Sequence, residues 1–411
     1  MEKLQEEMNG KQAVVSAKSS GLPLFRRCEE KLAAIKNAGL YRRITDLQYD
    51  DAVTARDRNG KKYIVFSSNN YLGLTFDPRV IKASAEAVRE GTGSTGSRLT
   101  TGGVFAASEL EQELAAFKQA EAALLFNTGY MTNLGVLYGL TEPGDVIFSD
   151  GLNHASIIDG CRISRCRTEV FRHSDMADLE RKLQACKAEV KMIVTDGVFS
   201  MDGDLARLPE LVRLKEKYKA LLIVDDAHAV GVLGDDGAGT ASHYRLEGNV
   251  DLQVGTLSKS LASEGGYVAG SRVLIEYLRN KSRPFIFSTF LSPADTAAAA
   301  MALRILRTEG KRLLGRLREN TALMCRLLQE GGIPVADTTE TPIIPVMVGD
   351  AAKATAIDYA LRERGILLSA IRPPTVAPGT SRLRLTVTAA HTEEQIRYTA
   401  AAMQQVWQAA K

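Results

Sequence analysis

Short apolar runs alternate with amphipathic helical patterns from about residue 61 of this 411-residue chain, and this alternation limits the fold more than any other feature. A strand that is apolar throughout must be covered on both faces, and helices between successive strands make parallel connections. The pattern therefore predicts an α/β fold with a mostly parallel central sheet. Strands are expected within 121–126, 146–148, 192–194, 221–224 and 252–254.

The pattern of the sequence changes near residue 295, where long helical patterns replace the alternation of short apolar runs and helices. This predicts a smaller α+β C-terminal domain with helices at 294–307 and 311–329, a strand at 343–348, a helix at 351–364, a strand at 381–388 and a last helix from Thr392. We therefore expect three parts: an N-terminal arm and helix (1–60), a large domain (61–295) and a small domain (296–411). Residues 1–20 are expected to form a mobile arm, and part of the N-terminal segment is expected to belong to the small domain. A cleft between domains is a common place for a ligand site.

Composition excludes several classes of protein. The net charge is only +3 with both signs interspersed, so the clustered basic stripe of a nucleic-acid-binding protein is missing. No apolar stretch approaches the roughly 20 residues of a membrane span, and the first twenty residues do not form a signal peptide. The five cysteines are scattered and make no zinc-binding pattern, which indicates reduced thiols and no metal site. We expect a cytoplasmic protein.

Candidate ligand-binding residues follow the predicted strands, because an open α/β sheet binds ligands beyond the carboxyl ends of its strands. Gly129 and Tyr130 come after the strand at 121–126, where a helix start offers free N–H groups to a phosphate. A plain strand-to-helix turn would have the same sequence. His154 follows the strand at 146–148, although a single histidine is more often structural.

Two carboxylates and a lysine follow the next strands. Asp225 and Asp226 come directly after the strand at 221–224, and burying them is costly unless a cation meets one of them. A structural ion pair is the alternative interpretation, and spacing does not decide which aspartate faces a ligand. Lys259 follows the strand at 252–254 in a small polar turn. A desolvated lysine near other cations loses its proton readily and becomes a nucleophile.

This arrangement resembles the fold-type-I enzymes that use pyridoxal 5′-phosphate (PLP), and more narrowly the α-oxoamine synthase family. The resemblance extends from about Leu40 to the C-terminus and would make 61–295 the PLP-binding domain. The matching stretches are 67–74 (SSNNYLGL), 91–103, 153–156 (NHAS), 197–204 (GVFSMDGD), 225–228 (DDAH), 256–259 (TLSK) and 382–385 (RLRL).

The resemblance implies catalytic roles for a few residues around the PLP ring. Lys259 would carry PLP as a Schiff base and later remove the α-proton of the amino acid. Asp225, which the family motif favours over its neighbour, would keep the ring nitrogen protonated so that the ring accepts electrons. His154 would stack on the ring face. His228 and Ser200 would contact the phenolic oxygen of the ring.

The resemblance also implies how the phosphate is held. The backbone at Gly129 and Tyr130 and the hydroxyl of Thr256 would bind it within one chain. Ser288 and Thr289 would reach the phosphate of a neighbouring subunit, which implies a homodimer with active sites at the subunit interface.

The substrates implied by the family are an amino acid and an acyl-CoA, joined with loss of CO2. Arg384 would bind the amino-acid carboxylate with its two-pronged guanidinium group, helped by Asn69. The C-terminal sequence most resembles the branch that joins L-alanine to a pimeloyl thioester, carried by CoA or a carrier protein, in biotin biosynthesis. Condensation of glycine with acetyl-CoA is the alternative.

An Ile-Arg-Pro-Pro run distinguishes these two branches, and it contains Arg372, with Thr375 just beyond. A pimeloyl chain ends in a carboxylate, or in an ester on a carrier protein, so Arg372 could orient it. Arg372 could equally help Arg384 to bind the amino-acid carboxylate. Arg42 or Arg43 would meet the acyl-CoA, and the resemblance does not decide between them.

Two rival classes share part of this pattern. An aminotransferase or amino-acid lyase shares the aspartate and lysine but does not need the 67–74 and 91–103 segments. A PLP-sensing regulator would need an N-terminal DNA-binding module, and the forty residues before the resemblance are neither long nor basic enough.

Overall fold

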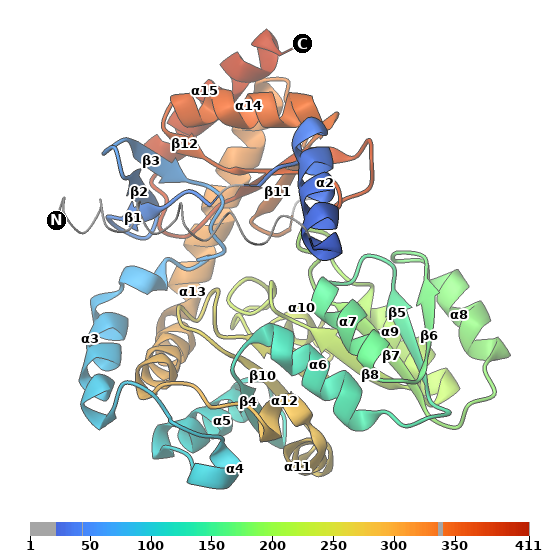
Figure 1. The fold of residues 1–411 in the computed structure, drawn as a ribbon. Helices are drawn as coiled ribbons and strands as arrows, with labels where there is room; N and C mark the ends of the chain where they lie inside the picture. The colour runs from blue at the N-terminus through green and yellow to red at the C-terminus, as the bar shows by residue number, and fades with distance from the viewer. Residues whose placement is uncertain (1–21, 43, 336–339, 411) are drawn as a thin grey trace.

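The computed structural model describes residues 22–42, 44–335 and 340–410 (Figure 1). The mobile arm predicted for residues 1–20 lies outside the described residues. The largest sheet has seven strands in the order β4-β10-β9-β8-β7-β5-β6. These strands are β4 (Ala122–Phe126), β5 (Val146–Asp150), β6 (Arg167–Phe171), β7 (Lys191–Asp196), β8 (Leu221–Asp225), β9 (Leu252–Thr256) and β10 (Gly266–Gly270). In this sheet β10 runs antiparallel to both of its neighbours, β4 and β9, and the remaining neighbouring strands pair in parallel, so the predicted mostly parallel sheet is confirmed.

Helices cover both faces of this sheet (Figure 1). Ile147 and Val194 pack in a cluster with α6, α7 and α11, whereas their sequence neighbours Phe148 and Ile193 pack with α8 and α9. Successive strand residues point to opposite faces, which explains why these strands are apolar throughout. The helices of this part are α5 (Phe105–Phe117), α6 (Gly129–Leu140), α7 (Ala155–Ile163), α8 (Met176–Ala185), α9 (Leu208–Tyr218), α10 (Thr240–Tyr244), α11 (Arg272–Lys281) and α12 (Arg283–Ile286).

Two strands of the sheet are missing from the sequence prediction. The edge strand β6 is largely polar, so it gives no apolar run. The central strand β10 begins and ends with glycine, which is unfavourable in strands. The glycine at 266 has a packing reason, because a Cβ atom there would lie 2.6 Å from the backbone nitrogen of Gly129. Close approach to the start of α6 therefore requires glycine in β10.

The C-terminal part contains α13 (Pro293–Glu330), β11 (Ile343–Gly349), α14 (Ala351–Glu363), β12 (Ile366–Leu367), β13 (Ser369–Ile371), β14 (Ser381–Thr386) and α15 (Glu393–Ala409). Strands β11, β14 and β13 form an antiparallel sheet in that order. A second sheet has the order β1-β2-β3-β12, in which β12 pairs in parallel with β3. The N-terminal strands β1 (Leu47–Tyr49), β2 (Thr54–Asp57) and β3 (Lys62–Val65) thus join the C-terminal part. The predicted domain boundaries stay a prediction.

The two helices predicted at 294–307 and 311–329 are one continuous helix, α13. Gly310 lies in the gap between the two predicted helices, and glycine costs about 1 kcal/mol relative to alanine inside a helix. Gly310 is buried, and a Cβ atom there would lie 3.2 Å from Leu306 Cδ1. Leu306 and Leu314, on either side of the glycine, are buried in the same core cluster. The apolar burial on both halves outweighs the glycine penalty.

The remaining helical elements are α2 (Pro23–Asn37), η1 (Leu74–Phe76), α3 (Pro78–Ala87), η2 (Val88–Glu90) and α4 (Arg98–Thr101). Among the residues that the structure describes, no helix combines the length and apolar character needed to cross a membrane.

Candidate active site

A cavity of about 210 Å³ lies beyond the ends of β4, β7, β8 and β9. Eight of the ten residues predicted to contact the cofactor line it, namely Gly129, Tyr130, His154, Ser200, Asp225, His228, Thr256 and Lys259. Residues that follow different strands of the sheet, and that are far apart in the sequence, therefore line one cavity. Five further lining residues were not predicted, namely Thr128, Ser156, Asp196, Ala227 and Ser258.

The two adjacent aspartates point in different directions. Asp225 lines the cavity, and its carboxylate accepts hydrogen bonds from Asn133 Nδ2 at 2.6 Å and from the backbone N–H of Ala227 at 2.9 Å. Asp226 lies 2.6 Å from Lys118 Nζ, and both side chains of this pair are 1% exposed. Both interpretations made from the sequence therefore apply, a ligand-facing carboxylate for the first aspartate and a structural ion pair for the second.

Lys259 has the electrostatic environment of a nucleophile. Burial lowers its pKa to about 8, and the charge of Arg384 acts in the same direction while Asp225 and Asp196 oppose it. The ordinary pKa of lysine is about 10.4, so a much larger fraction of the amine is neutral near pH 7 than in water. A neutral amine beside a carboxylate is able to attack a carbonyl carbon.

One end of the cavity is suited to a phosphate. Helix α6 begins at Gly129, and the N-cap Thr128 accepts a hydrogen bond from the backbone N–H of Met131 at 3.0 Å. The first backbone N–H groups of a helix lack partners within it and attract anions. The hydroxyls of Thr256 and Ser258 lie 2.8 Å apart. A Cβ atom on Gly129 would lie 3.2 Å from Thr256 Cβ, so glycine keeps the helix start close to these hydroxyls.

His228 lies at the other side of the cavity in a buried hydrogen-bonded pair. Its Nδ1 is 2.6 Å from the hydroxyl of Tyr71. Burial, together with the charges of Lys259 and Arg384, holds the pKa of His228 well below its usual range. Burial also raises the pKa of Tyr71 to about 12. Both side chains are therefore neutral, and His228, which lines the cavity, is able to hydrogen-bond a polar ligand atom.

Ser200 lies on a loop that is held from two directions. Arg384 of β14 donates from Nε to the carbonyl oxygen of Ser200 at 2.5 Å. On the other side His173 bridges Asp150 and Asp204, each at 2.9 Å. Burial opposes a charge on His173, but the two carboxylates raise its pKa to about 10, so the imidazolium persists at neutral pH. This ion triplet fixes the loop against β5.

Arg384 and Asn69 are adjacent, as their predicted joint role requires. Arg384 Nη2 donates to Asn69 Oδ1 at 3.0 Å, and Asn69 Oδ1 also accepts from the hydroxyl of Tyr71 at 3.3 Å. Arg384 is buried, and its charge affects the pKa values of Lys259 and His228. The guanidinium group therefore lies close to the cavity, although it is not part of the described lining.

Ser288 and Thr289 do not belong to the described lining of this cavity. They follow α12, where the carbonyl oxygen of Thr289 accepts a hydrogen bond from Asn127 Nδ2 at 2.7 Å. Phe287, just before them, is 71% exposed. Their predicted contribution to a second subunit stays a prediction.

Arg42, Arg372 and Thr375 come together in a second hollow of about 630 Å³. Arg42 Nη2 donates to Thr375 Oγ1 at 3.0 Å, and Arg372 Nη1 donates to the carbonyl oxygen of Gly39 at 2.8 Å. Arg384 is not part of the described lining of this hollow. Arg43 lies outside the described residues.

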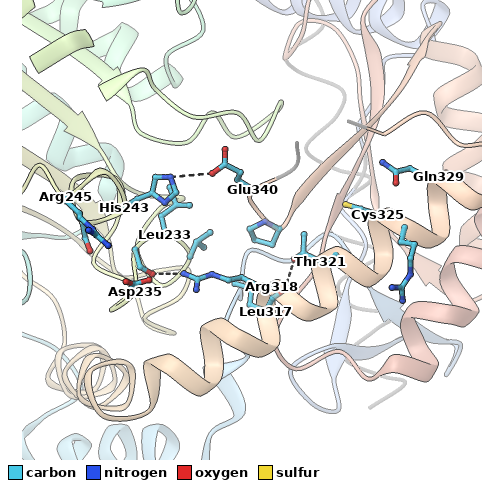
Figure 2. A pocket seen from close by; sticks show the side chains of 16 residues that line it. Leu233, Asp235, His243, Arg245, Leu317, Arg318, Thr321, Cys325, Gln329 and Glu340 are labelled. Atoms are coloured by element: carbon cyan, nitrogen blue, oxygen red, sulfur yellow. Dashed lines mark hydrogen bonds and ion pairs between the residues drawn. The ribbon is translucent and has the colours of Figure 1, made fainter. Parts of the chain in front are cut away.

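A third hollow, of about 660 Å³, lies between the 232–245 segment and α13 (Figure 2). Arg318 and Glu340 give this hollow charges of both signs. Glu340 lies 3.4 Å from His243 Nε2, and Arg318 donates to the carbonyl oxygen of Gly234 at 2.7 Å. Its described lining includes no residue predicted for the cofactor site. The chemistry therefore concentrates in the smaller cavity around Lys259.

Asp196 is the most consequential residue that the sequence prediction missed. It ends β7, pairs in register with Asp225, and accepts a hydrogen bond from the backbone N–H of His154 at 2.7 Å. Burial and the neighbouring Asp225 raise the pKa of Asp196 well above its usual range. The same strand-end rule that selected Asp225 would have found it.

Comparisons with known proteins identify the family of this chain. The family model described as aminotransferase class I and II matches residues 61–403. An 8-amino-7-oxononanoate synthase from Thermoanaerobacter pseudethanolicus is 48% identical over 371 residues, which cover 90% of this chain and 93% of that protein. One from Lysinibacillus sphaericus is 49% identical, covering 82% of this chain and 87% of that protein.

A solved structure of a serine palmitoyltransferase variant from S. paucimobilis, with a bound PLP–myriocin aldimine, has a TM-score of 0.89 to this chain. It is 34% identical and covers 95% of this chain and 99% of its own. This chain belongs to the α-oxoamine synthase family of fold-type-I PLP enzymes. The predicted fold class and cofactor are thereby confirmed.

The residues of the cavity fit PLP. A buried carboxylate at Asp225 matches a protonated ring nitrogen, and Lys259 supplies an amine for the aldehyde carbon. The start of α6 offers N–H donors to a phosphate, and the hydroxyl of Thr256, which donates to the carbonyl oxygen of Gly265 at 2.9 Å, lines the cavity as well. Each of these polar parts of the cofactor would thus meet a group of complementary chemistry.

Proposed function

We propose that this protein condenses L-alanine with pimeloyl-CoA, or with the pimeloyl thioester of a carrier protein, to give 8-amino-7-oxononanoate, CO2 and the free thiol carrier in biotin biosynthesis. The observation that carries the proposal is a lysine of lowered pKa that lines the same cavity as Asp225, in a chain 48% identical to an 8-amino-7-oxononanoate synthase. The relatives do not favour condensation of glycine with acetyl-CoA.

When bound, PLP supplies an electron sink for the negative charge that develops on the amino-acid Cα. Asp225 would hold the proton on the ring nitrogen, and His154 would contact the ring. Lys259 would hold the cofactor, and its free amine would take the Cα proton of the amino acid. A pKa lowered to about 8 suits an amine to that role near neutral pH.

The remaining residues of the cavity hold polar atoms in place. His228 and Ser200 would hydrogen-bond the phenolic oxygen of PLP, and the start of α6 with Thr256 would bind its phosphate. Arg384 and Asn69 would orient the amino-acid carboxylate. The guanidinium of Arg384 already has the partners that fix its plane.

The hollow around Arg372 is proposed to bind the acyl donor. Arg42 and Arg372 both line this hollow, whose volume of about 630 Å³ is large enough for an extended acyl chain. Its arginines suit the distal carboxylate of a pimeloyl chain or the phosphates of CoA. Because Arg384 is absent from the described lining, this location supports the acyl role of Arg372 over a role at the amino-acid carboxylate.

A competition assay tests the substrates. Purified enzyme is offered alanine and glycine against pimeloyl-CoA and acetyl-CoA, and the products are identified by mass. We expect kcat/KM to favour alanine with pimeloyl-CoA, because a site that pairs a substrate charge rejects a substrate lacking it. A preference for glycine with acetyl-CoA would assign the chain to the alternative branch.

We further propose that the active species is a homodimer with shared sites. Phe105 and Phe287 are 91% and 71% exposed, which is unfavourable for an isolated subunit. The 91–103 segment contacts the 285–290 segment, since Ser94 Oγ donates to the carbonyl oxygen of Phe290 at 2.8 Å. The 91–103 segment, which matches the family, thus lies beside the segment that contains Thr289.

Mixing inactive variants tests the shared site. Chains with Lys259→Ala and chains with Thr289→Glu, which places a carboxylate beside the phosphate, should each be inactive. Equal mixing with subunit exchange should restore about a quarter of the wild-type activity, since half the dimers are hybrids with one intact site. Lys259→Ala mixed with Asp225→Asn is the control and should stay inactive, because both residues line the cavity of one chain. Proven exchange without recovery in the first mixture would contradict a site completed by Thr289.

A further inference from the structure

Asn133, in the second turn of α6, is 2% exposed and lies behind the wall of the candidate active site. Its side-chain amide donates to Asp225 Oδ2 at 2.6 Å and to Ser156 Oγ at 2.9 Å. The orientation of the amide is determined by chemistry, because the oxygen of the amide would repel the carboxylate. One buried amide group therefore touches two residues of the cavity lining.

Through Ser156 the same amide reaches His154. Ser156 Oγ lies 2.8 Å from His154 Nδ1, and the backbone N–H of Ser156 also donates to Nδ1 at 3.2 Å. A ring nitrogen that accepts an N–H is unprotonated, so neutral His154 carries its proton on Nε2. Because Ser156 Oγ accepts from Asn133, its own proton is free to donate to the same Nδ1.

Asp225 depends on this amide. Asp225 is 5% exposed, and its carboxylate accepts hydrogen bonds from the side-chain amide of Asn133 and from the backbone N–H of Ala227. Each of these bonds involves a charged acceptor, and such bonds are shorter and stronger than neutral ones. Without the amide, the carboxylate of Asp225 could rotate, or its Oδ2 could bind a proton more tightly. Either change would alter how the carboxylate holds a proton on the PLP ring.

We propose that Asn133 is a positioning residue that orients Asp225 toward the PLP ring nitrogen and, through Ser156, sets the tautomer and ring plane of His154. This inference rests on the proposed use of PLP at this cavity but not on the identity of the substrates. Asn133 is not itself a catalytic residue, because its amide acts through Asp225 and His154.

The experiment compares holoenzymes carrying Asn133→Leu, Asn133→Ser and Ser156→Ala with a matched control, Thr132→Val. Thr132 is the neighbouring residue of α6 and is fully buried, and its hydroxyl donates within the helix to the carbonyl oxygen of Thr128. For each protein we would measure the Kd of PLP, the pH midpoint of the visible absorbance of bound PLP, its visible circular dichroism, and Tm.

We expect Asn133→Leu to weaken PLP binding about tenfold, as loss of one charge-assisted hydrogen bond predicts, and to shift the absorbance midpoint by more than about half a pH unit. Asn133→Ser should show the same changes at smaller size if the leucine variant does not fold. Ser156→Ala should alter the visible circular dichroism, which reports on His154 beside the ring, with Kd within about twofold of wild type.

Unchanged Kd and absorbance midpoint in both Asn133 variants would overturn the inference, as would equal changes in Thr132→Val, because a merely structural role lowers Tm alone. The substrate assay distinguishes this result from failure of the proposed function. A wild-type enzyme that prefers other substrates, with the Asn133 shifts intact, refutes the proposed reaction and leaves the positioning role standing.

Discussion

Replacing Lys259 with alanine should lower kcat for the condensation by about 10⁴-fold or more, because the variant loses both the covalent anchor of PLP and the base for the Cα proton. The structure makes Lys259 the lysine of the described cavity lining, with a pKa lowered to about 8. Steady-state assay of product formation at saturating PLP measures the effect. The variant should keep its fold, since it replaces a desolvated amine by a smaller apolar group.

Chemical labelling gives the control for this variant. Reduction of wild-type holoenzyme with borohydride should leave one PLP on the peptide that contains Lys259. The rate at which PLP-free protein captures PLP should rise as the pH increases through about 8 and then level off, because only the neutral amine attacks the aldehyde. Label on another lysine, or substantial turnover by Lys259→Ala, would show that a different residue holds the cofactor.

Asp225→Asn should lower kcat by at least about 100-fold while the protein stays folded, because a charge-assisted bond worth about 1.5–3 kcal/mol at rest counts for more when carbanion charge develops. The amide of asparagine replaces the carboxylate in shape but does not stabilise a proton on the ring nitrogen. The measurement is kcat with alanine and pimeloyl-CoA, alongside the absorbance of bound PLP.

Asp226→Asn is the matched control, since it makes the same chemical change one residue away. It leaves the buried Lys118 uncompensated, so we expect it to lower the free energy of unfolding by about 3–5 kcal/mol. The folded fraction should retain turnover and the PLP spectrum. The reverse pattern, with Asp225→Asn active and Asp226→Asn folded but inactive, would mean that the second aspartate serves the cofactor.

Strand-end positions were predicted well from the sequence because they depend on local patterns. An apolar run marks a buried strand, and a polar side chain directly after it must lie at the sheet edge where ligands bind. His154, Asp225 and Lys259 follow from this rule, and all three line one cavity. Strand β10 and the continuity of α13 were missed, because the glycines in both elements oppose their local propensity and only the packing around Gly266 and Gly310 explains them.

The sequence by itself thus determined the mostly parallel α/β framework and the family of this chain, and it predicted Lys259 as the PLP lysine. Only the tertiary structure decided which of two adjacent aspartates faces the cavity, that Arg372 and Arg42 share a hollow, and that Asn133 touches Asp225. The reason is physical. Periodicity specifies the face and the end of an element on which a side chain lies, whereas its partner across 92 residues of chain depends on how the helices pack onto the sheet.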